Sequence, residues 1–210
     1  MLVRGRMSSP VITIEEEMPV MEALDMMRKK NIRRTPVLNK AGKMVGIVSD
    51  KDLLNAGPSD ATSLSVWEIN YLLSRLKVKE VMTRKVMTIE ANTPIEEAAY
   101  VMAQNKIGGL PVLEDGQLVG LITETDLFKV FLELMGAQDE GVRVTAVVPD
   151  EPGKLEAITH AITSAGGNFI SLGVFSGEIL AIKVTGLTEE EIAETIRPHV
   201  DKITDIRVCC

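Results

Sequence analysis

The sequence predicts an α+β protein with a duplicated N-terminal part and a smaller C-terminal part of a different pattern. The first observation is that GIVSDKDLL (46–54) recurs as GLITETDLF (120–128), each with a hydroxyl residue three positions before an aspartate. The second is that short β-branched runs alternate with segments of helical periodicity before these stretches. The third is that this pattern stops at the polar segment 138–141, and another order of elements follows.

The duplication is visible when residues 7–53 are aligned with residues 82–127, with one gap at Ala41. The alignment contains eighteen identities in forty-six pairs. Ordinary composition would give about three, at roughly one match in seventeen. The period is too long for a solenoid repeat. The chain therefore contains a true internal duplication.

Each copy predicts the order strand, helix, strand, strand, helix. In the first copy, a strand at VITI (11–14) precedes a helix that Pro19 opens. A hairpin with its turn at 40–42 and a helix that starts near Asp50 follow, and the second copy places its turn at 115–116. Because one copy has only a small sheet to bury, we expect both to pack sheet to sheet about a pseudo-twofold axis. Such packing leaves two equivalent clefts between them.

Composition limits the partners and the compartment. The hydrophobic fraction of 45% supports a folded core, and a net charge of −7 with only 3% aromatic residues argues against a nucleic-acid partner. No apolar run reaches the roughly 20 residues that span a bilayer, and the N-terminus has no signal-peptide pattern. Cys209 and Cys210 are adjacent and have no other cysteine to pair with, so they form neither a disulfide framework nor a zinc site. We expect a cytoplasmic protein without a nucleic-acid, membrane or metal partner.

The two copies, each ending in Gly-apolar-apolar-(Ser/Thr)-x-x-Asp, resemble a tandem cystathionine β-synthase (CBS) domain pair over about residues 5–135. The resemblance implies a regulatory module that binds adenosine nucleotides in the clefts between the repeats. AMP, ATP or S-adenosylmethionine would then be regulatory ligands, and no cofactor is required. The expected boundaries are 1–60 for the first repeat, 61–78 for a connector helix and 79–137 for the second repeat.

The aspartate of the recurring stretch has two compatible explanations. In a structural role, Ser49 with Asp52, and Thr123 with Asp126, form a capping box at the start of a helix. A capping box usually carries Glu or Gln, yet both copies use the shorter Asp. In a binding role, the carboxylate accepts hydrogen bonds from the two ribose hydroxyls, beside a hydroxyl side chain and at a helix N-terminus that favours phosphate.

The residues before the proline of the second strand differ between the copies. The first copy has Arg33 and Arg34 where the second has Gly108 and Gly109. In CBS pairs these positions line the clefts, so the resemblance implies that the arginines bind phosphate; the alternative is solvated surface. The glycines cannot hold phosphate through a side chain, although they let a ligand approach the backbone. We therefore expect two unequal clefts, with arginines upstream of the recurring stretch in the first copy alone.

Apolar residues near the ends of the first strands complete the expected site. Ile12 and Met87 are either walls for an adenine ring or ordinary core residues. The predicted nucleotide site comprises Ser8, Ile12, Ile32, Arg33, Arg34, Pro36, Ser49, Asp52, Thr83, Met87, Ile107, Gly108, Gly109, Pro111, Thr123 and Asp126.

The connector between the copies predicts a helix of its own. Ser65 and Glu68 have capping-box spacing, and the apolar stripe that follows is flanked by Trp67 and Tyr71. This stripe either covers the sheets of the pair or forms the face of a homodimer. The connector and the N-terminal MLVRGRMSSPVITI together resemble the acetoin-utilisation AcuB-type group of CBS proteins, which implies a context in carbon metabolism.

Residues 142–210 predict strand, helix, strand, strand, helix, strand, the ferredoxin-like order βαββαβ. Asp150 is the expected N-cap of the first helix, and Pro152 is expected in its first turn. The phrase PDEPGKL, with GGNFISL downstream, resembles an ACT domain. The resemblance implies sheets that pair edge to edge and an amino-acid site near Gly153 and Asn168. The alternative is that Gly153 serves only the turn.

Catalysis is not expected, because the chain has only two histidines and none of the common catalytic or dinucleotide-binding motifs. We expect a regulatory sensor in which an adenosine-containing ligand binds the CBS clefts and the ACT domain provides dimerisation, output or a second ligand site. Two other hypotheses are a ligand-free oligomeric scaffold and a regulator that responds to amino acids through the ACT domain alone. The sequence identifies neither the nucleotide nor the regulated protein.

Overall fold

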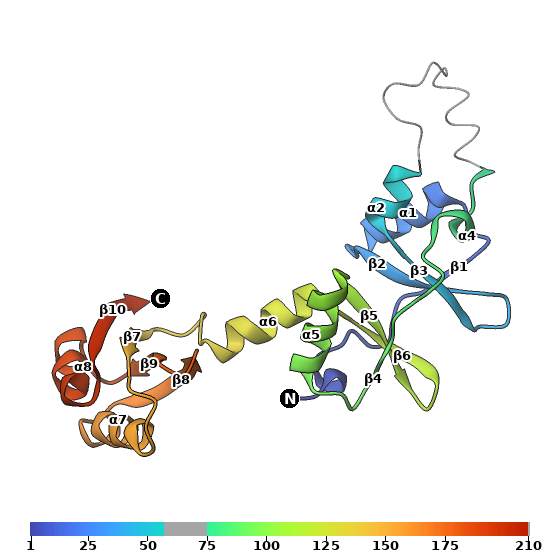
Figure 1. Ribbon diagram of the computed structural model, residues 1–210. Helices are drawn as coiled ribbons and strands as arrows, with labels where there is room; N and C mark the ends of the chain where they lie inside the picture. Colours follow the sequence, from blue (N-terminus) through green and yellow to red (C-terminus); the bar gives the residue numbers. More distant parts are fainter. Residues whose placement is uncertain (57–74, 210) are drawn as a thin grey trace. The chain divides into compact units, whose positions relative to one another are not determined.

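The computed structural model describes residues 1–56 and 75–209. The chain divides into two compact units, Met1–Leu127 and Phe128–Cys210 (Figure 1). Most of the predicted connector helix, including Ser65, Trp67, Glu68 and Tyr71, lies outside the described residues. No helix in the described part of the chain is long and apolar enough to cross a membrane.

The first repeat contains a three-stranded sheet with the order β1-β2-β3. Strand β1 runs parallel to β2, and β2 and β3 form the predicted antiparallel hairpin. The elements are β1 (Ile14–Glu15), α1 (Val20–Lys29), β2 (Arg34–Leu38), β3 (Met44–Ser49) and α2 (Asp50–Asn55).

The first strand is shorter than the sequence predicts. Of the VITI run, only Ile14 joins the sheet, where it pairs with Val37. The carbonyl of Ile12 instead accepts a hydrogen bond from Thr35 Oγ1 at 2.6 Å. This bond gives the carbonyl of Ile12 a hydrogen-bond partner outside the sheet. The residues before Ile14 therefore need not pair as a strand, and they can line a cleft.

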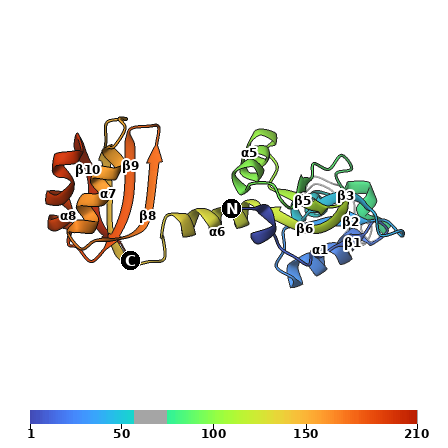
Figure 2. The same cartoon turned by 90° about the horizontal axis from the view of Figure 1, so that it is seen from below.

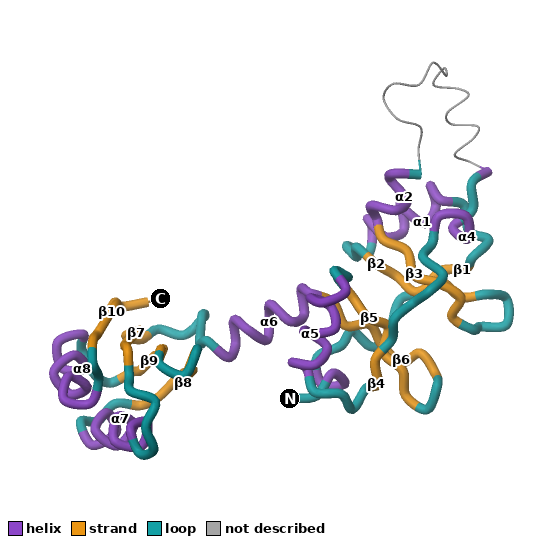
Figure 3. The backbone as a smooth tube through the Cα atoms, viewed as in Figure 1, coloured by secondary structure: helices purple, strands orange, loops and turns teal. Residues whose placement is uncertain are grey.

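The second repeat has the same plan, with the sheet order β4-β5-β6. Figure 3 shows the strands of both small sheets in orange and their helices in purple. The elements are β4 (Ile89–Glu90), α5 (Ile95–Asn105), β5 (Gly109–Glu114), β6 (Gln117–Thr123) and α6 (Glu124–Leu134). The predicted element order is thus confirmed in both copies.

The core of the first repeat follows from the helical spacing in α1. Val20, Leu24 and Met27 are each at most 4% exposed and pack with Val37 and Val48 of the sheet. Burial of each such side chain contributes about 1.5–3 kcal/mol. The apolar face of α1 therefore holds the helix against the sheet.

The segment that precedes each first strand pairs with the other repeat. Ser8 and Leu121 exchange two backbone hydrogen bonds of 2.9 and 3.2 Å, and Thr83 and Ile47 exchange two of 2.9 and 3.0 Å at the equivalent positions. The short helices η1 (Val3–Gly5) and α4 (Val78–Val81) lie in these exchanged segments. The two repeats are therefore joined by a mutual exchange of segments, each paired with the other repeat through an isolated β-bridge, which we call strand exchange below.

The C-terminal unit has the predicted βαββαβ order, and its four strands form an antiparallel sheet in the order β10-β7-β9-β8. Helices α7 and α8 lie on one face of this sheet (Figure 2), where Ile158 and Ile192 are fully buried in a shared core. The elements are β7 (Gly141–Val147), α7 (Lys154–Ser164), β8 (Asn168–Phe175), β9 (Ile179–Thr185), α8 (Glu189–Ile196), η2 (Arg197–His199) and β10 (Lys202–Cys209).

The predicted start of α7 is wrong in detail. The N-cap is Gly153, in a left-handed conformation with φ 88°, and no side chain caps the helix. Asp150 lies three residues before Gly153. Its side chain lies beside Gly177, with Oδ2 3.2 Å from the position that a Cβ on Gly177 would occupy. Pro152 precedes the helix. A positive φ at Gly153 turns the chain directly into the helix, so a capping side chain at Asp150 is not used.

Candidate functional site

Two of the clefts between the repeats contain the predicted site residues, and each of these two is built from both repeats. We name them the Arg33 cleft, with a volume of about 340 Å³, and the Gly108 cleft, with a volume of about 410 Å³. The Arg33 cleft is lined by Ser8, Pro10, Val11, Ile12, Asn31, Ile32, Arg33, Arg34, Leu121, Thr123, Glu124, Thr125 and Asp126. The Gly108 cleft is lined by Arg34, Ile47, Val48, Ser49, Asp52, Thr83, Lys85, Val86, Met87, Asn105, Lys106, Ile107, Gly108 and Gly109.

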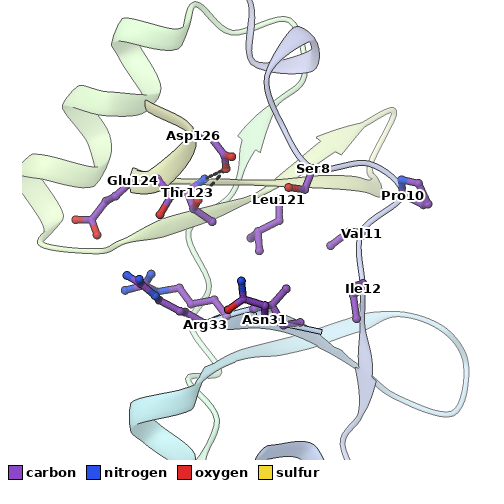
Figure 4. A pocket seen from close by; sticks show the side chains of 13 residues that line it. Ser8, Pro10, Val11, Ile12, Asn31, Arg33, Leu121, Thr123, Glu124 and Asp126 are labelled. Atoms are coloured by element: carbon purple, nitrogen blue, oxygen red, sulfur yellow. Dashed lines mark hydrogen bonds between the residues drawn. The ribbon is translucent and has the colours of Figure 1, made fainter. Parts of the chain in front are cut away.

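The repeats contribute to each cleft in a crossed manner. In the Arg33 cleft, the arginine loop of the first repeat faces Thr123 and Asp126 of the second (Figure 4). In the Gly108 cleft, the glycine loop of the second repeat meets Asp52 of the first. Arg33 therefore shares a cleft with the aspartate of the other copy, although it lies upstream of the aspartate of its own copy in the sequence.

The recurring stretch forms the predicted cap at the start of each helix. Asp52 Oδ2 accepts hydrogen bonds from the backbone N–H of Ser49 at 2.8 Å and from its hydroxyl at 2.7 Å. The hydroxyl oxygen of Ser49 in turn accepts from the backbone N–H of Asp52 at 3.2 Å, which completes a capping box. Asp126 Oδ2 accepts from the N–H and the hydroxyl of Thr123 at 2.9 and 2.7 Å.

Only one oxygen of each carboxylate takes part in these caps. Among the described residues, Oδ1 of Asp52 and Oδ1 of Asp126 make no hydrogen bond, and both side chains are half-buried in cleft walls. A carboxylate oxygen can accept two hydrogen bonds. The complete capping box is thus confirmed for Asp52, whereas Asp126 provides, of the two capping-box bonds, only that with the backbone N–H of Thr123. One acceptor oxygen for a ligand hydroxyl is left over in each cleft. The contact with ribose stays a prediction.

The two apolar wall residues are not core residues. Ile12 is 38% exposed and Met87 is 44% exposed, and each lines one cleft. The alternative that they belong to the ordinary core is therefore wrong. Pro36 and Pro111, in contrast, are buried within β2 and β5 and are not among the residues that line either cleft.

Arg33 and Arg34 have different surroundings. Arg33 is exposed on the Arg33 cleft, and its side chain has no hydrogen bond or ion pair within the described residues. Arg34 is half-buried, and its Nη1 donates a hydrogen bond of 3.0 Å to the carbonyl of Gly108 in the other repeat. A Cβ on Gly108 would lie 2.2 Å from Arg34 Nη2, so the guanidinium can hold this position only while residue 108 is glycine.

Both clefts contain residues that sequence reasoning missed. The Gly108 cleft is lined by Lys85 and Lys106, so it has cations despite its glycine loop, and the Arg33 cleft also holds the carboxylate of Glu124. Lys106 and its counterpart Asn31 have positive φ values of 53° and 51° at the ends of α5 and α1. The signal for these two was their place just after a helix, where a left-handed residue commonly ends the helix and turns the chain.

The predicted amino-acid site in the C-terminal unit rests on two residues. Gly153 is the left-handed N-cap of α7, and Asn168 is the first residue of β8. A Cβ on Gly153 would meet no atom within 4 Å, so its backbone conformation, not a close contact, favours glycine here. This supports the role in the turn, and the amino-acid site stays a prediction.

Solved structures resemble the N-terminal unit. The CBS domain pair of protein MJ0100, in complex with 5′-methylthioadenosine and S-adenosyl-L-methionine, is 30% identical with a TM-score of 0.52, and the match covers 62% of this chain and 95% of that chain. A protein from Vibrio cholerae that is named as an acetoin utilization protein (AcuB) is 29% identical with a TM-score of 0.54. That match covers 66% of this chain and 96% of the other.

Among the curated relatives, one is matched over nearly its whole length and another is a much larger enzyme. An uncharacterized protein of Methanocaldococcus jannaschii is 32% identical over 155 residues, covering 63% of this chain and 92% of the relative. L-aspartate semialdehyde sulfurtransferase of the same organism is 31% identical over 133 residues, covering 62% of this chain, which spans only 23% of the enzyme.

The CBS domain family matches residues 3–59 and 78–133, more than half of the chain. These ranges coincide with the two repeats that exchange strands and form the two clefts. The chain therefore belongs to the CBS domain proteins and contains a tandem CBS pair.

Proposed function

We propose that this protein is a regulatory sensor that binds an adenosine-containing ligand in the clefts of its CBS pair. The observation that carries the proposal is the arrangement repeated in both clefts: a helix start, a hydroxyl residue and a carboxylate with one oxygen left over. A cis-diol needs neighbouring acceptors, which such a carboxylate provides. The ligands of the similar CBS pair, 5′-methylthioadenosine and S-adenosyl-L-methionine, both contain adenosine.

The arrangement favours one orientation of the ligand in each cleft. Ribose would bind Asp126 in the Arg33 cleft and Asp52 in the Gly108 cleft, and the adenine ring would pack on Ile12 or Met87. Phosphates of AMP or ATP would lie toward the cations of the same cleft, because a guanidinium or ammonium group favours their charge.

The role is regulatory, not catalytic. The chain spans only 23% of the sulfurtransferase that it resembles, so the activity of that enzyme is not carried over to this protein. We place the protein in the cytoplasm, in accordance with the sequence-based expectation. A ligand would act by binding one arrangement of the CBS pair more tightly than another.

The C-terminal unit is the proposed output. Its βαββαβ order supports the assignment as an ACT domain, which would provide homodimerisation, contact with a regulated protein, or an amino-acid site near Gly153 and Asn168. The likeness to the protein named as AcuB supports a context in acetoin or carbon metabolism.

Calorimetric titration of the full chain with AMP, ATP and S-adenosylmethionine tests the proposal. We expect at least one of them to bind, and we expect Asp52→Asn and Asp126→Asn each to remove one of two sites. Asparagine keeps one acceptor oxygen for the helix cap but replaces the other with an NH₂ donor, so binding falls while folding is preserved.

Two results would contradict parts of this proposal. If the wild type binds none of the three ligands, the sensor function is wrong. The result would then favour a ligand-free oligomeric scaffold or a regulator that responds to amino acids through the ACT domain. If it binds but both Asn variants bind equally well, the ribose assignment alone is wrong. Thermal unfolding of the variants is the control that their caps are intact.

A further inference from the structure

Arg34 is the one described residue that lines both clefts. Its counterpart in the second repeat is Gly109, which has no side chain. The pair of clefts therefore has a cation at its boundary that comes from one repeat only.

The contacts of Arg34 hold its guanidinium at this boundary. Nη1 donates to the carbonyl oxygen of Gly108, which also accepts a bond of 3.3 Å from the N–H of Glu124. The missing side chain of Gly108 leaves room for Nη2. No carboxylate forms an ion pair with Arg34 within the described residues. One of its five N–H donors is engaged with Gly108, and the others are left for another acceptor.

We propose that Arg34 is a specificity-determining residue shared by the two clefts, so that it selects anionic ligands in the Gly108 cleft as well as in the Arg33 cleft. This inference rests on the proposed function. A half-buried guanidinium binds phosphate or carboxylate strongly, because it is always charged and its planar fork suits two acceptors. A ligand without an anionic group gains little from it.

The sharing has a consequence for occupancy. Because the same guanidinium lines both clefts, anionic ligands in the two clefts compete for its N–H donors. Two phosphorylated ligands are therefore expected to bind the wild type with unequal affinities, whereas two molecules of adenosine are not coupled through this residue.

The competing explanation is that Arg34 only fastens the repeats together through Gly108. In that case its removal would weaken every ligand by a similar factor, because the cleft walls would move apart whatever the charge of the ligand. The ratio of ATP affinity to adenosine affinity separates the two explanations. Arg33 provides the matched control, since it carries the same charge but lines one cleft only.

The experiment uses the full chain with one cleft blocked at a time. Ile12→Trp fills the Arg33 cleft and Met87→Trp fills the Gly108 cleft, because both side chains are exposed on the cleft walls. In each background, calorimetry measures ATP and adenosine for the parent, for Arg34→Ala and for Arg33→Ala. Removing a charge-assisted hydrogen bond should cost about tenfold in affinity.

We expect Arg34→Ala to weaken ATP about tenfold in both backgrounds and to leave adenosine within about twofold. Arg33→Ala should weaken ATP only when the Arg33 cleft is open. The proposal is overturned if the Arg34→Ala effect is confined to one background, if ATP binds in one cleft only, or if ATP and adenosine weaken equally. A wild type that binds S-adenosylmethionine but neither ATP nor adenosine would overturn the shared role alone, whereas a wild type that binds none of these ligands, nor AMP, would refute the proposed function as well.

Discussion

At the scale of single residues, the two aspartates combine two roles in one carboxylate. In Asp52 and Asp126 the oxygen Oδ2 caps a helix, and Oδ1 has no hydrogen-bond partner among the described residues. The longer Glu of an ordinary capping box would place its carboxylate differently. The use of Asp in both copies thus provides a bond to the start of the helix and leaves one acceptor oxygen in the cleft wall.

Gly108 gives a residue-scale prediction. Gly108→Ala places a Cβ 2.2 Å from Arg34 Nη2, so the guanidinium must leave the carbonyl that it contacts. We expect the loss of this hydrogen bond to lower the unfolding free energy by about 0.5–1.5 kcal/mol, measured by urea denaturation. Gly5→Ala is the control, because a Cβ there would meet nothing within 4 Å. Equal losses in the two variants would contradict the steric explanation.

At the scale of elements, the exchanged segments are secured by ion pairs as well as by backbone bonds. Lys79 of α4 binds Glu17 of the first repeat at 2.6 Å, and Arg4 of η1 binds Glu114 of the second at 2.6 Å. Both ion pairs are partly exposed, so solvent screening keeps their contribution to stability small.

The Glu17–Lys79 pair predicts a specific pH dependence. The hydrogen bond from Lys79 lowers the pKa of Glu17 below its ordinary value. Its contribution to stability is therefore fully present above the unfolded-state pKa and is lost as the pH falls through the lower folded-state pKa. Urea unfolding from pH 7 to pH 3 should show that the difference between the wild type and Glu17→Gln shrinks in this acidic range. In a Lys79→Gln background, Glu17→Gln should change the pH profile much less, with only the weaker effects of Lys40 and Lys77 left; an undiminished difference would contradict the pairing.

Most elements could be predicted from the sequence, because their signals are local. The spacing of Val20, Leu24 and Met27 predicts a buried helix face, and the hydroxyl–aspartate spacing predicts the caps. The crossed clefts could not be predicted in this way. That Arg33 faces Asp126 depends on strand exchange between the repeats, and no local pattern encodes such long-range pairing.

At the scale of the whole molecule, neither CBS repeat is complete by itself. Val3 of the N-terminal segment is fully buried, and Val3 N–H donates to Thr93 in the second repeat, while Val78 N–H donates to Met18 in the first. Each sheet thus depends on residues that the sequence assigns to the other copy. Ligand clefts formed between two such repeats are sensitive to any change in the exchange.

Deletion of residues 1–9 tests this dependence. The amides of Ile95 and Leu121 lose their acceptors, the carbonyls of Met1 and Ser8, and should exchange with solvent hydrogen faster by at least about tenfold. The amide of Leu180, in the sheet of the C-terminal unit, should keep its protection. Hydrogen exchange followed by mass spectrometry or NMR provides the measurement. Unchanged protection of Leu121 would show that the N-terminal segment is dispensable.

The strand exchange also determines the order in which the chain can fold. Ser9 contacts Val119 across 110 residues of sequence, so the N-terminal segment has no docking site until the second repeat has been made. Closing so long a loop is costly in entropy and slow compared with forming local hairpins. During synthesis, the first repeat emerges with its own sheet edge open and its leading segment unpaired. Completion of the second repeat then closes both edges, which makes the folding of the pair one late cooperative event instead of two successive ones.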